Sequence, residues 1–96
     1  MPKQGYVYIL ASKKKGTLYI GVTSNLPRRV QQHVAGVYSG FTKRYKVNQL
    51  VYCEAYDDIQ DAIAREKQLK EWDRQWKIEL IESLNPDWHD LTGDWL

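Results

Sequence analysis

Two helical stretches of the chain carry ionisable residues on the side that should face the core. The first spans residues 26–37, and its apolar positions recur at helical spacing: Leu26, Val30, Val34 and Val37. At about 100° per residue, His33 falls inside that apolar arc and Arg29 lies at its edge. In the second, residues 59–72, Glu66 stands at the centre of four apolar positions: Ile59, Ala62, Ile63 and Leu69. Because a charge facing the core is costly unless it is paired, hydrogen-bonded or bound to a metal, these three ionisable residues are candidates for a functional site.

Two tyrosines precede these helices, in stretches that read as the strands of a hairpin. The tip between them, residues 13–16, is basic and ends in glycine. With this tip as the loop, Leu10 lies opposite Tyr19 and Tyr8 lies opposite Gly21. Tyr8 and Tyr19 then become diagonal neighbours on one face, about 7–8 Å apart, although a loop one residue longer would separate them. We expect the two tyrosines and the three ionisable residues to converge on one face of a sheet, as in an active site.

The order of the expected elements indicates a small α+β domain. Strands are expected at residues 6–11, 17–23 and 49–56, and helices at residues 26–37, 59–72 and 74–84, with a polar, basic loop at residues 36–47. This order predicts a three-stranded antiparallel sheet flanked by about three helices. The 96 residues suit a single domain with its core at about residues 5–84, followed by an acidic tail, residues 85–96, that should pack back on it. The four tryptophans are expected in the core and the tail: Trp72, Trp76, Trp88 and Trp95.

The composition points to a cytoplasmic protein without a membrane partner. Cys53 is the only cysteine, so no internal disulfide can form, as in a reducing compartment. The longest apolar run, Tyr6–Ala11, is far shorter than the roughly 20 residues that span a bilayer. The start of the chain leads directly into a strand and does not resemble a signal peptide.

Charge is divided unevenly along the chain. Residues 1–56 hold nine Lys and Arg against one acid, and residues 57–96 hold five against eleven. A half this basic suits a polyanion, and we expect two basic groups to contact phosphates. These groups are Lys13, Lys14 and Lys15 at the hairpin tip and Lys43, Arg44 and Lys46 in the long loop. Lys77, beside the apolar side of the last helix, is a further candidate for a phosphate contact.

An ordered set of motifs gives these observations a common meaning. Tyr6-Val7-Tyr8 is followed by Tyr19-Ile20-Gly21, then by Arg29, His33 and a helical Glu66. In this order and spacing the chain, from Tyr6 to Leu84, resembles the GIY-YIG nuclease domain. It is most similar to the small stand-alone bacterial members of the UPF0213 type.

The resemblance implies a metal-dependent phosphodiesterase that uses a single divalent cation, Mg²⁺ or Mn²⁺. Glu66 would be the metal ligand, since hard cations accept one carboxylate and keep several waters. Arg29 would stabilise the charge of the transition state. Tyr19, with Tyr8 or His33, would orient or deprotonate the attacking water. Tyrosine, with a free pKa of about 10, is a poor base, and His33 titrates nearer neutrality, so the proton acceptor stays open between Tyr19 and His33.

Two positions depart from the family's pattern. Tyr6 stands where the first tripeptide usually has glycine, and Val22 stands where the repair-incision branch has a lysine beside the catalytic tyrosine. Activation of the tyrosine must then come from His33 or from the metal. The expected function is an endonuclease in DNA repair or processing, acting on DNA rather than RNA, with any specificity supplied by an oligomer or a protein partner. The alternatives are a catalytically silent nucleic-acid-binding module on the same fold, and a protein-interaction domain that uses the acidic helices.

Overall fold

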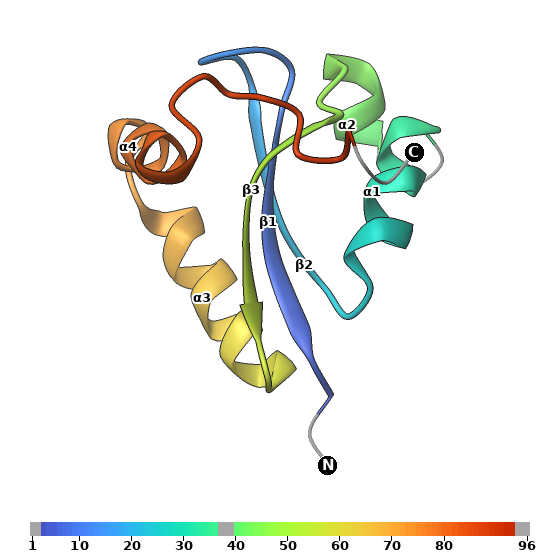
Figure 1. Ribbon diagram of the computed structural model, residues 1–96, viewed down its shortest axis with the longest axis vertical. Coiled ribbons are helices and arrows are strands. Elements are labelled where there is room, and N and C mark those ends of the chain that lie inside the picture. Colours follow the sequence, from blue (N-terminus) through green and yellow to red (C-terminus); the bar gives the residue numbers. More distant parts are fainter. Residues whose placement is uncertain (1–2, 37–39, 94–96) are drawn as a thin grey trace.

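The computed structural model describes residues 3–36 and 40–93, which form an antiparallel sheet with helices on both faces (Figure 1). Its strands are β1 (Gly5–Ala11), β2 (Leu18–Thr23) and β3 (Gln49–Tyr56), in the order β2-β1-β3. Its helices are α1 (Leu26–Val34), α2 (Gly40–Tyr45), α3 (Ile59–Glu71) and α4 (Arg74–Leu84). The α+β class and the three-stranded antiparallel sheet are confirmed, with four described helices where about three were expected.

The register of the β1–β2 hairpin is the one that the length of its tip predicts. Tyr8 pairs with Gly21, and Leu10 pairs with Tyr19. The Ser12 amide donates to the Thr17 carbonyl at 3.0 Å and closes the loop. This register places Tyr8 and Tyr19 on one face of the sheet, with 6.3 Å between their ring centroids.

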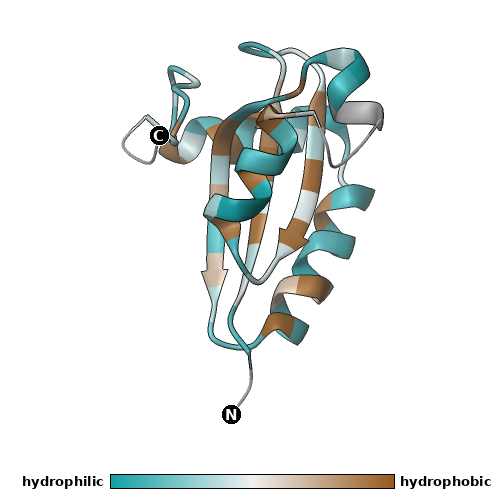
Figure 2. Ribbon diagram, turned by 90° about the vertical axis from the view of Figure 1, so that its right-hand side faces the viewer, coloured by the Kyte–Doolittle hydropathy of each residue, from teal (hydrophilic) through white to brown (hydrophobic). Residues whose placement is uncertain are grey.

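Alternate residues of the strands serve two separate cores. On one face, Val7, Ile9 and Ala11 pack with residues of α3 and α4 such as Leu69 and Ile81. On the other face, Tyr8 and Leu10 pack with two residues of α1, Leu26 and Val30. Figure 1 shows α1 and α3 on opposite sides of the sheet, and Figure 2 shows hydrophobic stretches along the strands that α1 covers. Each face therefore has its own set of side chains for a site.

The segment after α4 packs against β3. Leu91 donates its amide to the Leu50 carbonyl at 2.8 Å, and the buried Asn85 side chain donates to the Val51 carbonyl at 3.0 Å. Trp88 is only 4% exposed and belongs to the core beneath α3. The tail thus contributes to the core up to the last described residues, and Trp95 lies outside the described part.

Three expectations about the helices are wrong in detail. The first helix ends at Val34 rather than Val37, because Gly36 adopts a φ of 72° that terminates it, and Val34 is 47% exposed. Val37 lies outside the described residues. The short helix α2 falls within the expected loop, since six residues are too few to show an apolar repeat. Trp76 is 55% exposed, not in the core. None of the described helices combines the length and the apolar run needed to cross a membrane.

Candidate active site

Tyr8 lies in the middle of the face covered by α1, and a glycine on the neighbouring strand makes room for its ring. Its side chain is fully buried. A Cβ atom added to Gly21, the residue opposite, would overlap the hydroxyl and the ring of Tyr8. The tyrosine can therefore extend over β2 only because residue 21 has no side chain. Its hydroxyl lies 3.0 Å from His33 Nε2, within hydrogen-bond distance.

His33 reaches this position because of the way α1 begins. The Asn25 side chain accepts a hydrogen bond from the Arg28 amide at 3.2 Å and caps the helix, and Pro27 fits its first turn. The helix then presents His33 to the sheet, where it is 2% exposed. The His33 ring centroid lies 5.8 Å from that of Tyr8 and 5.1 Å from that of Tyr19. Three side chains from three elements thus form one compact group, which we call the Tyr–His cluster: Tyr8, Tyr19 and His33.

The electrostatic setting of His33 differs from the one expected from the sequence. Burial and the positive charge of Arg29 lower the pKa of His33 from 6.5 to about 4. The ring is therefore neutral at pH 7, and one of its nitrogens can accept a proton or a hydrogen bond. The expectation that His33 titrates near neutrality is wrong, because burial and a neighbouring arginine both disfavour the charged form of the ring.

Arg29 lies one helical turn before His33 and contributes to a polar hollow at the start of α1. The hollow has a volume of about 210 Å³ and is lined by Thr23, Ser24, Asn25, Arg28, Arg29 and Gln32. Two of these lining residues, Arg28 and Arg29, carry a permanent positive charge. A positive hollow beside the Tyr–His cluster suits an anionic group such as a phosphate.

Glu66 does not share a face with the Tyr–His cluster. It belongs to α3, which packs on the opposite side of the sheet, so the expected convergence of all five residues on one face is wrong. Its carboxylate is 15% exposed and lies 3.2 Å from the Lys70 ammonium. Lys70 also lines a second hollow, together with Tyr19. The two sides of the sheet thus meet at the outer edge of β2, with Tyr19 on one side and the Glu66–Lys70 pair on the other.

Any metal site here would rest on few protein ligands. Within the described ranges, 3–36 and 40–93, no three His, Cys, Asp or Glu side chains group as ligands. A hard cation that keeps most of its waters needs only one carboxylate. Glu66 fits that role, because its carboxylate already attracts a cation, the Lys70 ammonium.

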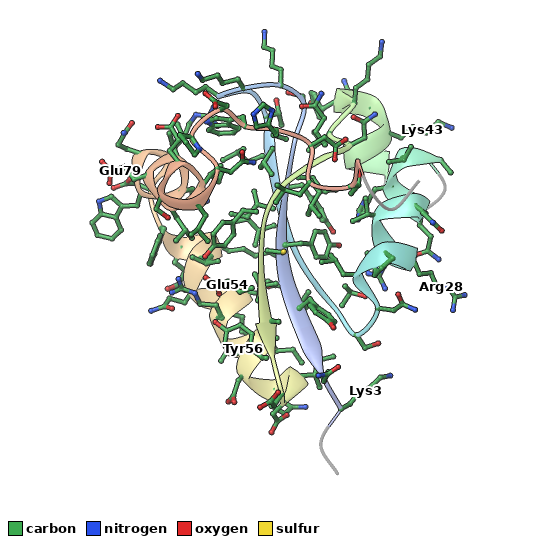
Figure 3. All side chains as sticks on the ribbon, in the orientation of Figure 1. Lys3, Arg28, Lys43, Glu54, Tyr56 and Glu79 are labelled. Carbon is green, nitrogen blue, oxygen red and sulfur yellow. The ribbon has the colours of Figure 1, made fainter. Side chains whose placement is uncertain are left out.

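The predicted phosphate-binding residues lie in three places: Lys77 lines the second hollow, with Tyr19, and the other six residues form two groups. Lys13, Lys14 and Lys15 are exposed at the hairpin tip, and Lys43, Arg44 and Lys46 are exposed on and just after α2. Both groups lie at the same end of the sheet (Figures 1 and 3). Arg74 Nη2 donates to the carbonyls of Lys15, at 2.6 Å, and Gly16, at 2.7 Å, and joins the tip to α4. No local pattern predicts this contact, because Arg74 is 59 positions from Lys15 and 58 from Gly16.

A second polar cluster lies on the face covered by α3, and we call it the Glu54 cluster: Tyr52, Glu54, Tyr56 and Arg65. Glu54 accepts from Tyr52 Oη at 2.5 Å, from Tyr56 Oη at 2.7 Å and from Arg65 Nε at 3.0 Å. Burial alone would raise the pKa of Glu54, but the hydrogen bonds from Arg65 and the two tyrosines more than reverse this and hold it below its ordinary value. Figure 3 shows Glu54 and Tyr56 towards α3, whereas Arg28 and Lys43 point away on the other side. These four residues were not among the site residues predicted from the sequence.

Comparison with known proteins agrees with this fold. Residues 4–79 match the family described as the GIY-YIG catalytic domain. The UPF0213 protein of Syntrophus aciditrophicus is 39% identical over 85 residues, which cover 88% of this chain and 95% of the relative. UPF0213 protein SH2523 of Staphylococcus haemolyticus is 38% identical over 77 residues, or 80% of this chain and 93% of the relative.

A solved structure is similar along almost the whole chain. The solution NMR structure of the UPF0213 protein BH0048 from Bacillus halodurans has a TM-score of 0.57 and a sequence identity of 28%. The match covers 93% of this chain and 94% of that protein. The α+β arrangement described above is therefore shared with an experimental structure.

Proposed function

Because the chain belongs to the GIY-YIG catalytic domain family, we propose that it is a divalent-metal-dependent endonuclease that hydrolyses phosphodiester bonds, with DNA rather than RNA as substrate. The family implies a nucleic-acid substrate. The observation that carries the proposal is the Tyr–His cluster, in which Tyr8 Oη lies 3.0 Å from a His33 ring that is neutral at pH 7. Arg29 stands one turn away, in a hollow that suits a phosphate.

Each residue then has a role in the in-line attack of water on phosphorus. Arg29, a permanently charged planar donor, stabilises the negative charge that develops on the phosphate oxygens. Tyr19, partly exposed at the edge of the cluster, orients the attacking water. His33, held next to both tyrosines, offers a neutral ring whose Nε2 lies within hydrogen-bond distance of Tyr8 Oη and so orients that hydroxyl.

Glu66 completes this set from the other side of β2. When a divalent cation is bound to this carboxylate, it supplies Lewis-acid stabilisation of charge on the phosphate. The Lys70 ammonium lies 3.2 Å from Glu66 and must give way to the cation. Mg²⁺ and Mn²⁺ both prefer oxygen ligands of this kind.

Cleavage of a panel of nucleic acids tests the proposal. The panel contains duplex, single-stranded, flap and branched DNA, and RNA, each with Mg²⁺ or Mn²⁺ and with a chelator. We expect the wild-type protein to cleave DNA, and expect cleavage to stop with the chelator and in Glu66→Gln. Glu71→Gln, an exposed glutamate of the same helix, serves as the matched control and should retain activity.

The other outcomes separate the alternatives. Binding without cleavage on every substrate would replace the proposal with a catalytically silent nucleic-acid-binding module. Equal activity in the wild type and Glu66→Gln would show that the cleavage comes from a contaminant or from a site that does not use Glu66. Neither binding nor cleavage would favour the protein-interaction domain.

A further inference from the structure

The hollow at the outer edge of β2 has a composition that the residues assigned above do not explain. Three consecutive strand residues and two lysines line it: Leu18, Tyr19, Ile20, Lys70 and Lys77. Its volume is about 290 Å³, which is room for a phosphate group and its waters. The strand order β2-β1-β3 leaves this side of β2 without a neighbouring strand in the described sheet. The hollow is thus open to a long, thin ligand that lies along the strand.

Hydrogen bonds fix the start of α4, the helix that carries one of these lysines, Lys77. Asp73 caps α4 through a hydrogen bond from the Trp76 amide at 2.9 Å, directly after the end of α3. Arg74 then ties the start of α4 to the hairpin tip through the carbonyls of Lys15 and Gly16. Lys70, Arg74 and Lys77 therefore follow one another along the side of α3 and α4 that faces the start of β2. Because Arg74 is occupied by two carbonyls, the lysines provide the charge of the hollow.

The lysines differ in the carboxylate that accompanies them. Lys70 Nζ lies 3.2 Å from Glu66 Oε1, and its side chain is 54% exposed. Within the described residues, Lys77 has no carboxylate at ion-pair distance. The hollow therefore holds one uncompensated ammonium and a second whose partner is the carboxylate that we assign to the metal.

We propose that Lys70 and Lys77 bind a backbone phosphate of the nucleic acid in this hollow, beside Tyr19, and that Lys70 leaves Glu66 for this phosphate when the substrate binds. The inference rests on the proposed function for the nature of the ligand. In the absence of substrate, Lys70 compensates the charge of Glu66. When Lys70 binds the phosphate, Glu66 becomes available to a divalent cation.

The position of this site defines a path for one strand of the substrate. The hollow of Lys70 and Lys77 lies at the Leu18 end of β2, and the hollow of Arg28 and Arg29 begins at Thr23. With a rise of about 3.3 Å per residue, the two ends of β2 are about 17 Å apart. A nucleic-acid strand along this edge can contact Tyr19 in the first hollow and the arginines in the second.

Binding measurements without metal test the phosphate site independently of cleavage. The affinity of each variant for a labelled DNA oligonucleotide is measured in a chelator across a range of salt concentrations. We expect Lys70→Ala and Lys77→Ala each to lower the slope of log K against log salt, and the double variant to lower it by about 0.7–0.9, the value for the one phosphate contact that the two lysines share. Lys67→Ala removes an exposed lysine of α3 outside the hollow and should keep the wild-type slope.

Binding of Mn²⁺ to the protein alone tests the exchange of partners. Electron paramagnetic resonance should show tighter Mn²⁺ binding in Lys70→Ala, by about 3–10-fold, because the ammonium that competes for Glu66 is gone. Lys77→Ala and Lys67→Ala should bind Mn²⁺ as the wild type does. Unchanged Mn²⁺ affinity in Lys70→Ala would contradict the proposal that Lys70 competes with the cation for Glu66.

The two proposals can fail separately. Salt slopes in Lys70→Ala and Lys77→Ala equal to that of Lys67→Ala would overturn the phosphate site even if the protein cleaves DNA in a Glu66-dependent manner. Reduced salt slopes in a protein that cleaves none of the substrates would support the phosphate site and contradict the proposed nuclease activity.

Discussion

The two faces of the sheet carry similar side chains and use them differently. Each has tyrosines and a nearby arginine, and the two faces differ in the group to which the tyrosine hydroxyls are bonded. On the face covered by α3, Glu54 accepts hydrogen bonds from Tyr52, Tyr56 and Arg65. The face covered by α1 has a neutral His33 in the corresponding place, bonded to Tyr8.

The carboxylate decides what the neighbouring groups can do. The hydrogen bond to Glu54 raises the pKa of Arg65, and burial with the bond to Glu54 raises that of Tyr52. These protons are therefore held firmly, which suits a structural cluster. On the other face, burial and the positive charge of Arg29 lower the pKa of His33 to about 4 and keep its ring neutral at pH 7. We propose that the Glu54 cluster stabilises the fold and that the Tyr–His cluster acts on an anionic substrate.

The largest expected effect is the difference in cleavage between two arginine variants, Arg29→Ala and Arg65→Ala. Arg29→Ala should lower turnover about 10²–10³-fold with little loss of DNA affinity, because the guanidinium acts mainly on the transition state. Arg65→Ala, assayed well below its melting temperature, should cleave at close to the wild-type rate. Single-turnover cleavage and binding of the same oligonucleotide measure both. Equal losses of binding and turnover in Arg29→Ala would make it a binding residue.

The pH dependence of stability should come from His33. Its pKa is about 4 in the fold and 6.5 when unfolded, so the unfolded chain binds the proton first as the pH falls. Stability is complete above pH 6.5, falls by about 3 kcal/mol down to about pH 4 and then levels off. Denaturant unfolding at several pH values should show this slope in the wild type and in His89→Gln, and lose it in His33→Gln. A slope that persists in His33→Gln would assign it to other groups.

Removal of the carboxylate from the Glu54 cluster should act on stability alone. Glu54→Ala leaves Arg65 and two tyrosine hydroxyls without their acceptor, at a cost of about 2–3 kcal/mol, since the pair is partly exposed. Urea unfolding gives the loss, and cleavage below the melting temperature should be unchanged. A variant that is stable but inactive would contradict the division between the faces.

A smaller change should disturb the Tyr–His cluster without removing any of its members. Gly21→Ala places a methyl group where the ring of Tyr8 lies, so the ring must move away from His33. We expect a loss of about 1–3 kcal/mol in stability, together with reduced cleavage. Gly93→Ala is the control, because a Cβ atom added to Gly93 would lie 3.8 Å from the Asp90 carbonyl oxygen, an ordinary contact distance.

Local rules were sufficient for the hairpin and for the placement of His33. The length of the basic tip determines the register of Tyr8 and Tyr19, and the helical period places His33 towards the sheet. The same period also predicted that Val34 faces the core, but Val34 is exposed at the end of the helix, because Gly36 ends the helix early through its backbone conformation. Chain geometry over a few residues thus accounts for one half of the candidate site.

Long-range packing decided the rest. The position of Glu66 depends on which face of the sheet α3 covers, and no local pattern of apolar residues distinguishes the two faces. The contact of Arg65 with Glu54 depends on the angle at which α3 crosses β3, and that of Arg74 with the hairpin tip on the turn before α4. The sequence therefore supplied candidate residues but not their division between two faces.

The most direct test compares two tyrosines that lose only a hydroxyl group. Tyr19→Phe and Tyr56→Phe are measured side by side for single-turnover cleavage of DNA with Mg²⁺ and for thermal unfolding. We predict that Tyr19→Phe loses at least 10²-fold in cleavage with little change in melting temperature. Tyr56→Phe should cleave normally and melt at a lower temperature, because Glu54 loses one of its hydrogen bonds. Normal cleavage by Tyr19→Phe, or loss of cleavage in Tyr56→Phe, would contradict the assignment of chemistry to the face covered by α1.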